Sequence, residues 1–257
     1  MGVPYNNPGT TATPSSQSPS NVLNMPAILK IRELDKEGLV HGFSTIELGS
    51  VGLTNAPDRD AVLANRRRFA EELGLDPAAL TATGAVHGAA VARIDVPQPL
   101  VKEHDAVITD QPGIALFATY ADCYPILLWD PEHHAIGLVH AGWRGTEAGV
   151  VTHAIQAMGK EFGTDPEHMT AVIGPGICGR CYEVGEEVAE KFSERFTAPK
   201  ASSKFLLDLA AANRAQLEDA GLRQIHALDL CTKETSYLPS HRRQPDGTRF
   251  GAIIALR

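Results

Sequence analysis

Three side chains with metal-ligand chemistry stand where apolar runs of the sequence end or meet glycine. They are His87 in Val-His-Gly, Cys123 in Ala-Asp-Cys and His140 in Val-His-Ala-Gly. Two imidazoles and one thiolate can hold Zn²⁺ through three protein ligands and leave a fourth position open, as catalytic zinc sites do. Their spacing matches no zinc finger, so the hypothesis depends on strand ends meeting in space, as they do at the ligand sites of α/β sheets.

The same three residues permit other interpretations. Cys123 can be a small buried apolar residue beside histidines that bond to nearby loops. Alternatively, the protein is a metal-free cysteine hydrolase or amidase, with Cys123 as nucleophile and His140 or His87 as general base. Asp122 precedes the cysteine, and in a regular strand its side chain would point to the opposite face, so we expect a structural acceptor there. The sequence alone leaves these alternatives open.

Two arginine-containing segments are candidates for binding an anion. Arg144 lies within Gly142–Gly145 at the predicted start of a helix, where free backbone N–H groups, the helix dipole and a guanidinium all favour an oxyanion. Arg242 lies in the polar segment 240–243, before the last predicted strand. Each segment has a plainer interpretation, a strand-to-helix turn for the first and a solvated turn for the second.

The segment 174–181 carries two motifs of low specificity. Gly174–Gly179 formally matches the dinucleotide-binding G-x-G-x-x-G, but Pro175 removes a backbone donor and the predicted helix begins too late. Cys178 and Cys181 form a C-x-x-C pair, which can be redox-active or half of a zinc site. The sequence contains no second C-x-x-C and the pair does not open a helix, so we favour two coincidental loop cysteines.

The elements that must position these residues alternate between apolar strands and amphipathic helices. Four apolar runs predict central strands covered on both faces: 106–109, 114–120, 124–129 and 135–140. Further strands are predicted at 27–34, 39–43, 86–94, 170–173, 224–230 and 250–256, and helices at 60–73, 146–159, 183–196 and 209–220. This order predicts an α/β (α+β) fold, a single layered sandwich of mixed β-sheets flanked by helices, over residues 27–257.

Composition and charge limit the possible functions. The chain has 257 residues, 43% of them hydrophobic, and its 23 Lys and Arg against 31 Asp and Glu give a net charge of −8. Such a composition excludes a collagenous or mostly disordered chain, and such a charge gives no general attraction to nucleic acid or anionic membranes. No apolar run approaches the roughly 18 residues of a membrane-spanning helix. We therefore expect a soluble protein, either a monomer or a small homo-oligomer.

Cysteine number and the N-terminal segment bear on location. Four cysteines are too few and too unevenly spaced for a disulfide scaffold, which favours a reducing compartment, the cytoplasm. Residues 1–26 are rich in Pro, Ser, Thr and Asn, contain no Lys or Arg and lack the pattern of a secretory signal. We expect this segment to be a disordered tail that is dispensable for activity.

Seven short motifs occur in order after this segment: 41–45 (HGFST), 86–88 (VHG), 121–125 (ADCYP), 139–145 (VHAGWRG), 174–177 (GPGI), 181–184 (CYEV) and 249–252 (RFGA). Together they closely resemble the YfiH/YlmD family, also called the laccase-domain or polyphenol oxidase family. The resemblance implies a CNF1/YfiH-like layered α/β fold shared with cysteine hydrolases, and a Zn²⁺ site at His87, Cys123 and His140. It also implies activity on purine nucleosides: phosphorolysis of adenosine, inosine, guanosine and methylthioadenosine, and deamination of adenosine.

The resemblance also points to residues that bind substrate, and the chain departs from the family at two positions. With phosphate as the second substrate, Arg144, Arg242 and Ser44 are the expected substrate- or phosphate-binding residues. The family usually has Arg where this chain has Ile46, which weakens an expected phosphate or ribose contact, and usually has Tyr at the position of His241. For deamination, a zinc-activated hydroxide would attack C6 of adenine, although the deaminase signature H-x-E…P-C-x-x-C is absent.

The laccase name can be compared with the histidine content. A multicopper oxidase needs about ten copper ligands, mostly histidines paired as H-x-H. This chain has ten histidines in all and no H-x-H. Zinc is therefore the expected metal, and copper with polyphenol oxidase chemistry is the alternative.

Overall fold

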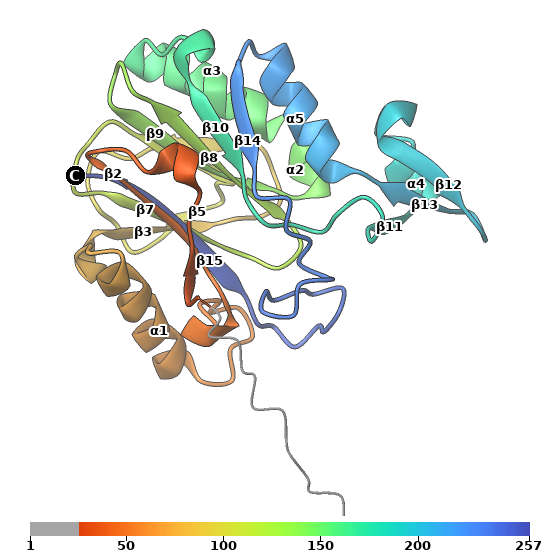
Figure 1. Ribbon diagram of the computed structural model, residues 1–257, viewed down its shortest axis with the longest axis horizontal. Coiled ribbons are helices and arrows are strands. Elements are labelled where there is room, and N and C mark those ends of the chain that lie inside the picture. Colours follow the sequence, from red (N-terminus) through yellow and green to blue (C-terminus); the bar gives the residue numbers. More distant parts are fainter. Residues whose placement is uncertain (1–25) are drawn as a thin grey trace, which may run out of the picture.

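Two six-stranded mixed sheets stack face to face at the centre of the computed structural model, which describes residues 26–257 (Figure 1). The strand order in the first sheet is β1 (Ile28–Leu29), β2 (Leu39–Ser44), β15 (Phe250–Leu256), β7 (Ala115–Tyr120), β3 (Leu80–Gly84) and β5 (Val101–Lys102). In the second sheet it is β14 (Gln224–Ala227), β10 (Thr170–Ile173), β8 (Tyr124–Asp130), β9 (Ala135–Ala141), β6 (Ala106–Thr109) and β4 (Val91–Arg93). Both sheets contain parallel and antiparallel pairs.

Alternating side chains along the central strands separate the core between the sheets from the outer cores. In β8, Leu127 packs between the two sheets, whereas Ile126 and Leu128 pack in the outer core on the other face of the second sheet. On the first sheet, Phe117 of β7 shares an outer core with Phe69. Because successive side chains of a strand point to opposite faces, strands covered on both faces are apolar throughout, as the four runs predicted.

Helices cover the two outer faces and give four layers (Figure 1). The first sheet is covered by α1 (Arg59–Glu72), which begins at Asp58, whose carboxylate accepts a hydrogen bond from the N–H of Ala61. The second sheet is covered by α3 (Val150–Phe162) and α5 (Leu209–Asp219). The predicted layered sandwich of mixed sheets flanked by helices is confirmed.

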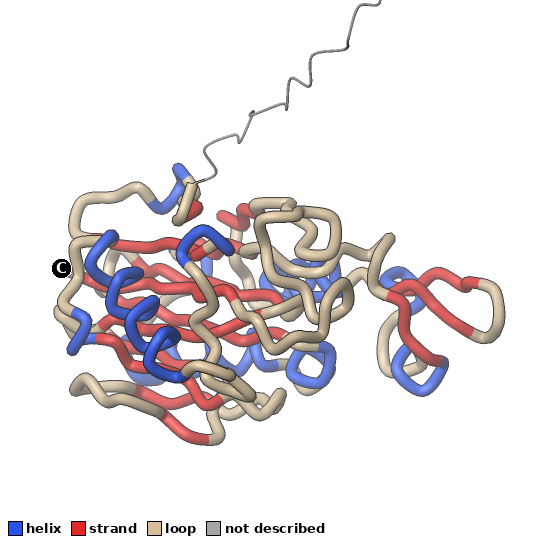
Figure 2. Tube along the Cα trace, turned by 90° about the horizontal axis from the view of Figure 1, so that it is seen from below, coloured by secondary structure: helices blue, strands red, loops and turns tan. Residues whose placement is uncertain are grey.

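A third, three-stranded sheet stands away from the stacked sheets, as Figures 1 and 2 show. Its strand order is β11 (Glu183–Gly185), β13 (Lys204–Leu207) and β12 (Thr197–Lys200), with the short helix α4 (Glu186–Ala189) after β11. The helix predicted over 183–196 is therefore wrong. Val184 and Val188 have helical spacing, but Val184 pairs with Phe205 in the sheet, and this long-range pairing overrides the local pattern.

The remaining differences from the sequence prediction concern the bounds of elements. The helix predicted at 146–159 is two helices, α2 (Trp143–Glu147) and α3, separated by Gly149 in the left-handed region. The strand predicted at 27–34 is reduced to β1, and that at 86–94 to β4. The short strands β3 and β5 were missed. Single turns of 3-10 helix occur at Arg32–Leu34, Ile46–Leu48, Pro77–Ala79, Pro166–His168 and Glu194–Phe196.

Two further expectations concern the N-terminal segment and membranes. The predicted tail lies outside the described residues except for Pro26. Within residues 26–257, no helix has both the length and the apolar character that crossing a membrane requires.

Candidate functional site

His87, Cys123 and His140 meet at one edge between the stacked sheets. His87 lies in the connection from β3 to β4, and Cys123 lies in the connection from β7 to β8; each connection passes from the first sheet to the second. His140 is the second-to-last residue of β9, which pairs directly with β8. One potential ligand atom from each of the three residues lies within 4.8 Å of the other two.

This cluster fits a single metal ion with an open face. Tetrahedral bonds of about 2.0–2.3 Å place zinc ligands roughly 3.3–3.8 Å apart, so small side-chain movements bring the three donors into range. His140 is buried, Cys123 is half-buried and His87 is exposed, so a remaining coordination position would face the open side. Imidazole and thiolate ligands suit both zinc and copper.

Asp105 holds two parts of this cluster together, and the sequence prediction missed it. Its buried carboxylate accepts hydrogen bonds from the backbone N–H groups of Val86 (3.1 Å), His87 (2.9 Å) and Gly88 (2.7 Å). The same carboxylate accepts a hydrogen bond from Nδ1 of His140 (3.0 Å). That bond leaves Nε2 of the ring available to a metal and fixes the tautomer of the ring. The only signal in the sequence is an acidic residue directly before an apolar strand.

The thiol and the imidazoles alter one another's ionisation. Burial opposes ionisation of Cys123, but the positive charge of His140 and hydrogen bonds from His140 and His87 outweigh it and lower the pKa of the thiol to about 6. Burial also opposes protonation of His140, but Cys123 and Asp105 outweigh it and raise the pKa of the imidazole to about 9. In the metal-free protein at neutral pH, a reactive thiolate therefore faces an imidazolium.

Two glycines allow the backbone to approach the cluster closely. A Cβ atom on Gly142 would lie 3.0 Å from Sγ of Cys123 and 3.1 Å from Cδ2 of His87. A Cβ atom on Gly145 would lie 2.8 Å from the carbonyl oxygen of Gly88. The glycines of the predicted anion-binding segment therefore make room for the cluster.

Both arginines predicted to bind an anion lie near the cluster, around Tyr182. Burial and the negative charge of Cys123 raise the pKa of Tyr182 to about 12, although the charges of Arg242 and Arg144 oppose the increase. The Arg242 guanidinium lies 5.2 Å from the centroid of the Tyr182 ring, and its Nη1 donates to a backbone carbonyl oxygen at 2.8 Å. Arg144 is exposed, and its guanidinium lies 4.2 Å from the centroid of the Trp143 ring. Tyr182 is thus a further residue of this edge, found only in the structure.

Ser44, also predicted to bind substrate, is placed inside the protein by the structure. Its side chain is fully buried, and its hydroxyl accepts a hydrogen bond from the N–H of Gly251 at 2.8 Å. The serine therefore joins β2 to β15 and has no surface for a substrate.

Ile46 lies on a 3-10 helix with 41% of its surface exposed, so an arginine there would have reached solvent. Because α2 has only five residues, its dipole is small, and the predicted binding of an anion at Arg144 would depend mainly on the guanidinium.

Asp122 has the structural role expected of it. Its carboxylate accepts one hydrogen bond from the Thr232 hydroxyl and another from the backbone N–H of Arg242, each 2.7 Å long. The residue is not in a regular strand, since its φ is 87°. Asp122 therefore fixes two other loops against the segment that carries Cys123.

A second cluster of potential ligands forms around the C-x-x-C pair. Cys178 and Cys181 lie beside Cys231 and Glu234, and one possible ligand atom from each lies within 4.8 Å of the others. All four cysteines of the chain are free thiols. The second pair, Cys231 and Glu234, is not a C-x-x-C motif because its second member is a carboxylate, so the motif alone does not reveal it.

Comparison with known proteins gives consistent relatives. The family model described as multi-copper polyphenol oxidoreductase laccase matches residues 40–257. A purine nucleoside phosphorylase of Streptomyces coelicolor is 40% identical over 214 residues, which cover 81% of this chain and 86% of the relative. A purine nucleoside phosphorylase of Deinococcus radiodurans is 37% identical over 228 residues, which cover 84% of this chain and 88% of the relative.

Solved structures give the same grouping. The hypothetical protein YfiH of Bacillus licheniformis superposes with a TM-score of 0.86 at 28% identity, covering 91% of this chain and 98% of that one. YlmD from Geobacillus stearothermophilus superposes with a TM-score of 0.81 at 30% identity, covering 86% of this chain and 93% of that one.

Proposed function

Because the chain belongs to the YfiH/YlmD family, we propose that it is a zinc-dependent enzyme that cleaves purine nucleosides with phosphate. The proposed substrates are adenosine, inosine, guanosine and methylthioadenosine, and deamination of adenosine is a second proposed reaction. Relatives named purine nucleoside phosphorylase support the first reaction. The observation that carries the proposal is the cluster of His87, Cys123 and His140 with two guanidinium groups beside it.

Zinc is the metal proposed for this cluster. Bound by the two imidazoles and the thiolate, it would supply a Lewis acid and lower the pKa of a coordinated water toward about 7. Asp105 would keep His140 and the backbone of His87 in position, since one carboxylate bonds to both. The thiol proton of Cys123 is lost readily, because its pKa is already about 6 in the metal-free protein.

Phosphorolysis requires the chain to bind an anion beside the sugar. A phosphate oxygen attacks C1′ of the ribose while the bond from C1′ to N9 of the purine breaks, and the base leaves. Arg144 and Arg242 would bind and orient the phosphate, which a chain of net charge −8 would otherwise repel. In deamination, water replaces the amino group at C6 of adenine and ammonia leaves; this reaction needs no phosphate.

The test is mass spectrometry of each nucleoside incubated with the purified full chain, with and without phosphate. We expect free base and sugar 1-phosphate only when phosphate is present, and inosine from adenosine in both conditions. Cys123→Ala should abolish both reactions, whereas Arg144→Gln and Arg242→Gln should raise the KM for phosphate and leave deamination unchanged. Arg223→Gln, which removes only an exposed ion pair with Glu167 (3.1 Å), is the matched control. No phosphate-dependent product from any of the four nucleosides would overturn the proposal.

A metal-free cysteine hydrolase or amidase is the second candidate, and one observation favours it. Cys123, His140 and Asp105 form a series in which the thiol pKa is lowered, the imidazole adjoins the thiol and the carboxylate orients the imidazole. Activity that survives removal of metal by a chelator but is lost on alkylation by iodoacetamide would support this candidate. Activity lost on chelation and restored by zinc would support the first.

Polyphenol oxidation finds less support among the residues present. All ten histidines lie within the described residues, and among these only His87 and His140 belong to a group of three or more potential metal ligands. That set suits one ion, whereas multicopper oxidation needs about ten ligands. We expect copper-loaded protein to oxidise phenols no faster than the same concentration of free copper, measured by absorbance of the quinone product.

A further inference from the structure

We propose that Cys178, Cys181, Cys231 and Glu234 form a second metal site, a structural one that binds Zn²⁺. The four residues come from two loops more than fifty positions apart in the chain, yet one ligand atom from each lies within 4.8 Å of the others. Three sulfurs and one carboxylate oxygen make a closed set of four donors, with no position left for a substrate. Closed, sulfur-rich sets of four are typical of structural zinc.

Two similar turns present these ligands. In the first turn the N–H of Cys181 donates to the carbonyl oxygen of Cys178 (2.9 Å), and in the second the N–H of Glu234 donates to that of Cys231 (3.2 Å). Each turn therefore brings its first and fourth residues together, as C-x-x-C turns do in zinc sites. The second turn has the sequence Cys-Thr-Lys-Glu, so the site combines C-x-x-C with C-x-x-E.

The backbone holds the two turns next to each other without help from a metal. Gly176 and Cys231 form a parallel β-bridge. In it, the N–H of Gly176 donates to the carbonyl oxygen of Leu230 (3.2 Å), and the N–H of Thr232 donates to the carbonyl oxygen of Gly176 (3.0 Å). Arg243 supports the second turn, because its Nη1 donates to the carbonyl oxygens of Thr232 (2.7 Å) and two further residues of that loop. The ligands are thus largely positioned before any ion binds.

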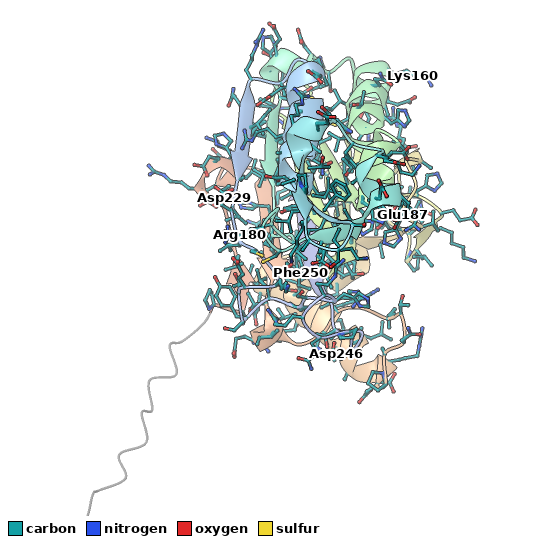
Figure 3. All side chains as sticks on the ribbon, turned by 90° about the vertical axis from the view of Figure 1, so that its right-hand side faces the viewer. Lys160, Arg180, Glu187, Asp229, Asp246 and Phe250 are labelled. Carbon is teal, nitrogen blue, oxygen red and sulfur yellow. The ribbon has the colours of Figure 1, made fainter. Side chains whose placement is uncertain are left out.

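Contacts within the cluster match what a thiolate-rich site needs. The backbone N–H of Cys178 donates to Sγ of Cys231 (3.4 Å), which would stabilise negative charge on that sulfur. The thiol of Cys181 lies 3.2 Å from Oε1 of Glu234, so a sulfur and a carboxylate oxygen already face each other. Arg180, labelled in Figure 3, pairs with Glu234 (Nε to Oε1, 2.8 Å), and its side chain is exposed.

Charge balance explains why an arginine adjoins this cluster. Three thiolates and one carboxylate carry four negative charges, of which a divalent ion offsets two and the guanidinium of Arg180 a third. Binding one Zn²⁺ would release the three thiol protons to solvent. A cavity of about 590 Å³ is lined by Cys178, Arg180 and Cys231 among others, so two of the three cysteines border open space.

The site would stabilise the loops around the first cluster. The N–H of Ile177 donates to the carbonyl oxygen of Asp122 (2.9 Å), and the hydroxyl of Thr232 donates to the carboxylate of Asp122 (2.7 Å). Asp122 directly precedes Cys123, so the two turns are hydrogen-bonded to the segment that carries the thiolate of the first cluster. An ion that joins these turns would hold that segment in place without contacting a substrate.

The experiment counts zinc in the full chain by elemental analysis, after loading under reducing conditions and removal of free metal. We expect two ions per chain in the wild type and one in Cys123→Ser, Cys178→Ser or Cys231→Ser. The double variant Cys123→Ser/Cys231→Ser should retain none. If Cys178→Ser and Cys231→Ser bind as much zinc as the wild type, the proposal is overturned.

A second measurement covers variants that fold poorly and identifies the ligands. In Cys123→Ser, which keeps only the proposed site, cobalt should give the intense near-ultraviolet absorption of several thiolates, and a chelator should lower the Tm. Glu234→Gln should weaken zinc binding in this background, and Glu132→Gln, an exposed carboxylate bonded to His168 (2.9 Å), is the matched control. A disulfide among Cys178, Cys181 and Cys231, found by peptide mass mapping without reductant, would contradict the proposal. These results do not depend on whether the chain cleaves nucleosides.

Discussion

At the scale of single residues, Asp105 connects two members of the candidate active site. Its buried carboxylate accepts hydrogen bonds from three backbone N–H groups around His87 and from the ring nitrogen Nδ1 of His140. These bonds lower the pKa of Asp105 although burial opposes ionisation. They also hold the backbone of His87 at a φ of 62°, in the left-handed region that residues other than glycine seldom adopt. The carboxylate thus positions two ligands without itself facing the open side.

Replacing this carboxylate should weaken metal binding. Asp105→Asn replaces one accepting carboxylate oxygen with an NH₂ group, which cannot accept a hydrogen bond. His140 and the loop of His87 should therefore lose their fixed orientation. We expect zinc affinity to fall about 10- to 100-fold and the free energy of unfolding to fall by about 1–3 kcal/mol. Competition with a chromophoric chelator measures the affinity, and thermal unfolding measures the stability.

Asp130→Asn is the matched control for this variant. Asp130 is also fully buried, and its carboxylate accepts hydrogen bonds from the N–H groups of Glu132 and His133 and from the His133 ring. It lies in β8, and its hydrogen bonds within residues 26–257 do not involve the ligands of the first cluster, so the variant should lose stability while zinc affinity stays unchanged. Equal losses of affinity in both variants would contradict the positioning role of Asp105.

The Cys123 thiol should show its lowered pKa in the metal-free protein. The thiolate is the reactive form, so the rate of alkylation rises with pH and reaches half its maximum near the pKa, about 6. His140→Gln removes the positive partner and should move this midpoint up toward the ordinary thiol value of about 8.5. Iodoacetamide labelling with peptide mass spectrometry measures the rate at Cys123 alone. A midpoint near 8.5 in the wild type would show that the imidazoles do not stabilise the thiolate.

The two clusters were predictable from the sequence to an unequal degree. The structure brings His87, Cys123 and His140 together, and the sequence suggested this because each stands at the end of an apolar run or beside a glycine, where strand ends converge. Asp105 was missed because an aspartate before a strand is common, and its four hydrogen bonds depend on a loop far away in the chain. Glu234 was missed because a carboxylate three residues after a cysteine has no recognised spacing. Ser44 was assigned by resemblance, which does not report burial.

At the scale of elements, the start of α2 must pass close to the first cluster. Gly142→Ala places a Cβ atom 3.0 Å from Sγ of Cys123, so the helix start or the ligands must move. A displacement of about 1 Å in an active site can reduce kcat/KM about 100-fold. We expect such a loss in Gly142→Ala, together with weaker zinc binding. Steady-state kinetics and chelator competition measure the two effects.

Gly159→Ala tests whether the effect of Gly142→Ala is specific to the cluster. Gly159 lies inside α3, and a Cβ atom there would meet its nearest neighbour at 3.4 Å, an ordinary contact at its limit. Alanine is the better helix former by about 1 kcal/mol, so the Tm should stay the same or rise slightly. Similar losses of zinc binding in both variants would rule out the steric explanation.

The elements that the sequence missed are those stabilised by distant partners. The central runs, such as 124–129, are apolar throughout because both faces are covered, and this local property is readable. In contrast, β11 has three residues and depends on β13, about twenty positions later in the chain. β5 has two residues and exists only through its pairing with β3. Such strands leave no periodic pattern to detect.

At the scale of the whole molecule, the candidate active site depends on the stacking of the two sheets. The connections that carry His87 and Cys123 both cross from the first sheet to the second, so the ligands meet only when the sheets pack together. The sequence predicted strands and their order, but it did not show which sheet each strand joins. The residue pattern could therefore suggest that the ligands converge, but only the packing of the sheets shows how they do so.

The same packing predicts where the chain can be shortened at its N-terminus. Among the described residues, the first contact is the carbonyl oxygen of Pro26, which accepts a hydrogen bond from the Thr45 hydroxyl (2.8 Å). β1 then pairs Ile28 with Ser44 and Leu29 with Phe43 at the edge of the first sheet. Deletion of residues 1–24 retains all of these contacts, so we expect unchanged activity and Tm.

Deletion of residues 1–30 provides the contrast, because it removes β1 and exposes the edge of β2. Each kcal/mol lost should lower the Tm by about 2–4 °C for a chain of this size, and we expect a loss of about 1–3 kcal/mol. Calorimetry of both deletions separates the two cases. Because β1 pairs with β2 and contributes no residue to the first cluster, zinc content should stay the same in both. A lower Tm after deletion of residues 1–24 alone would mean that the folded unit begins before residue 25.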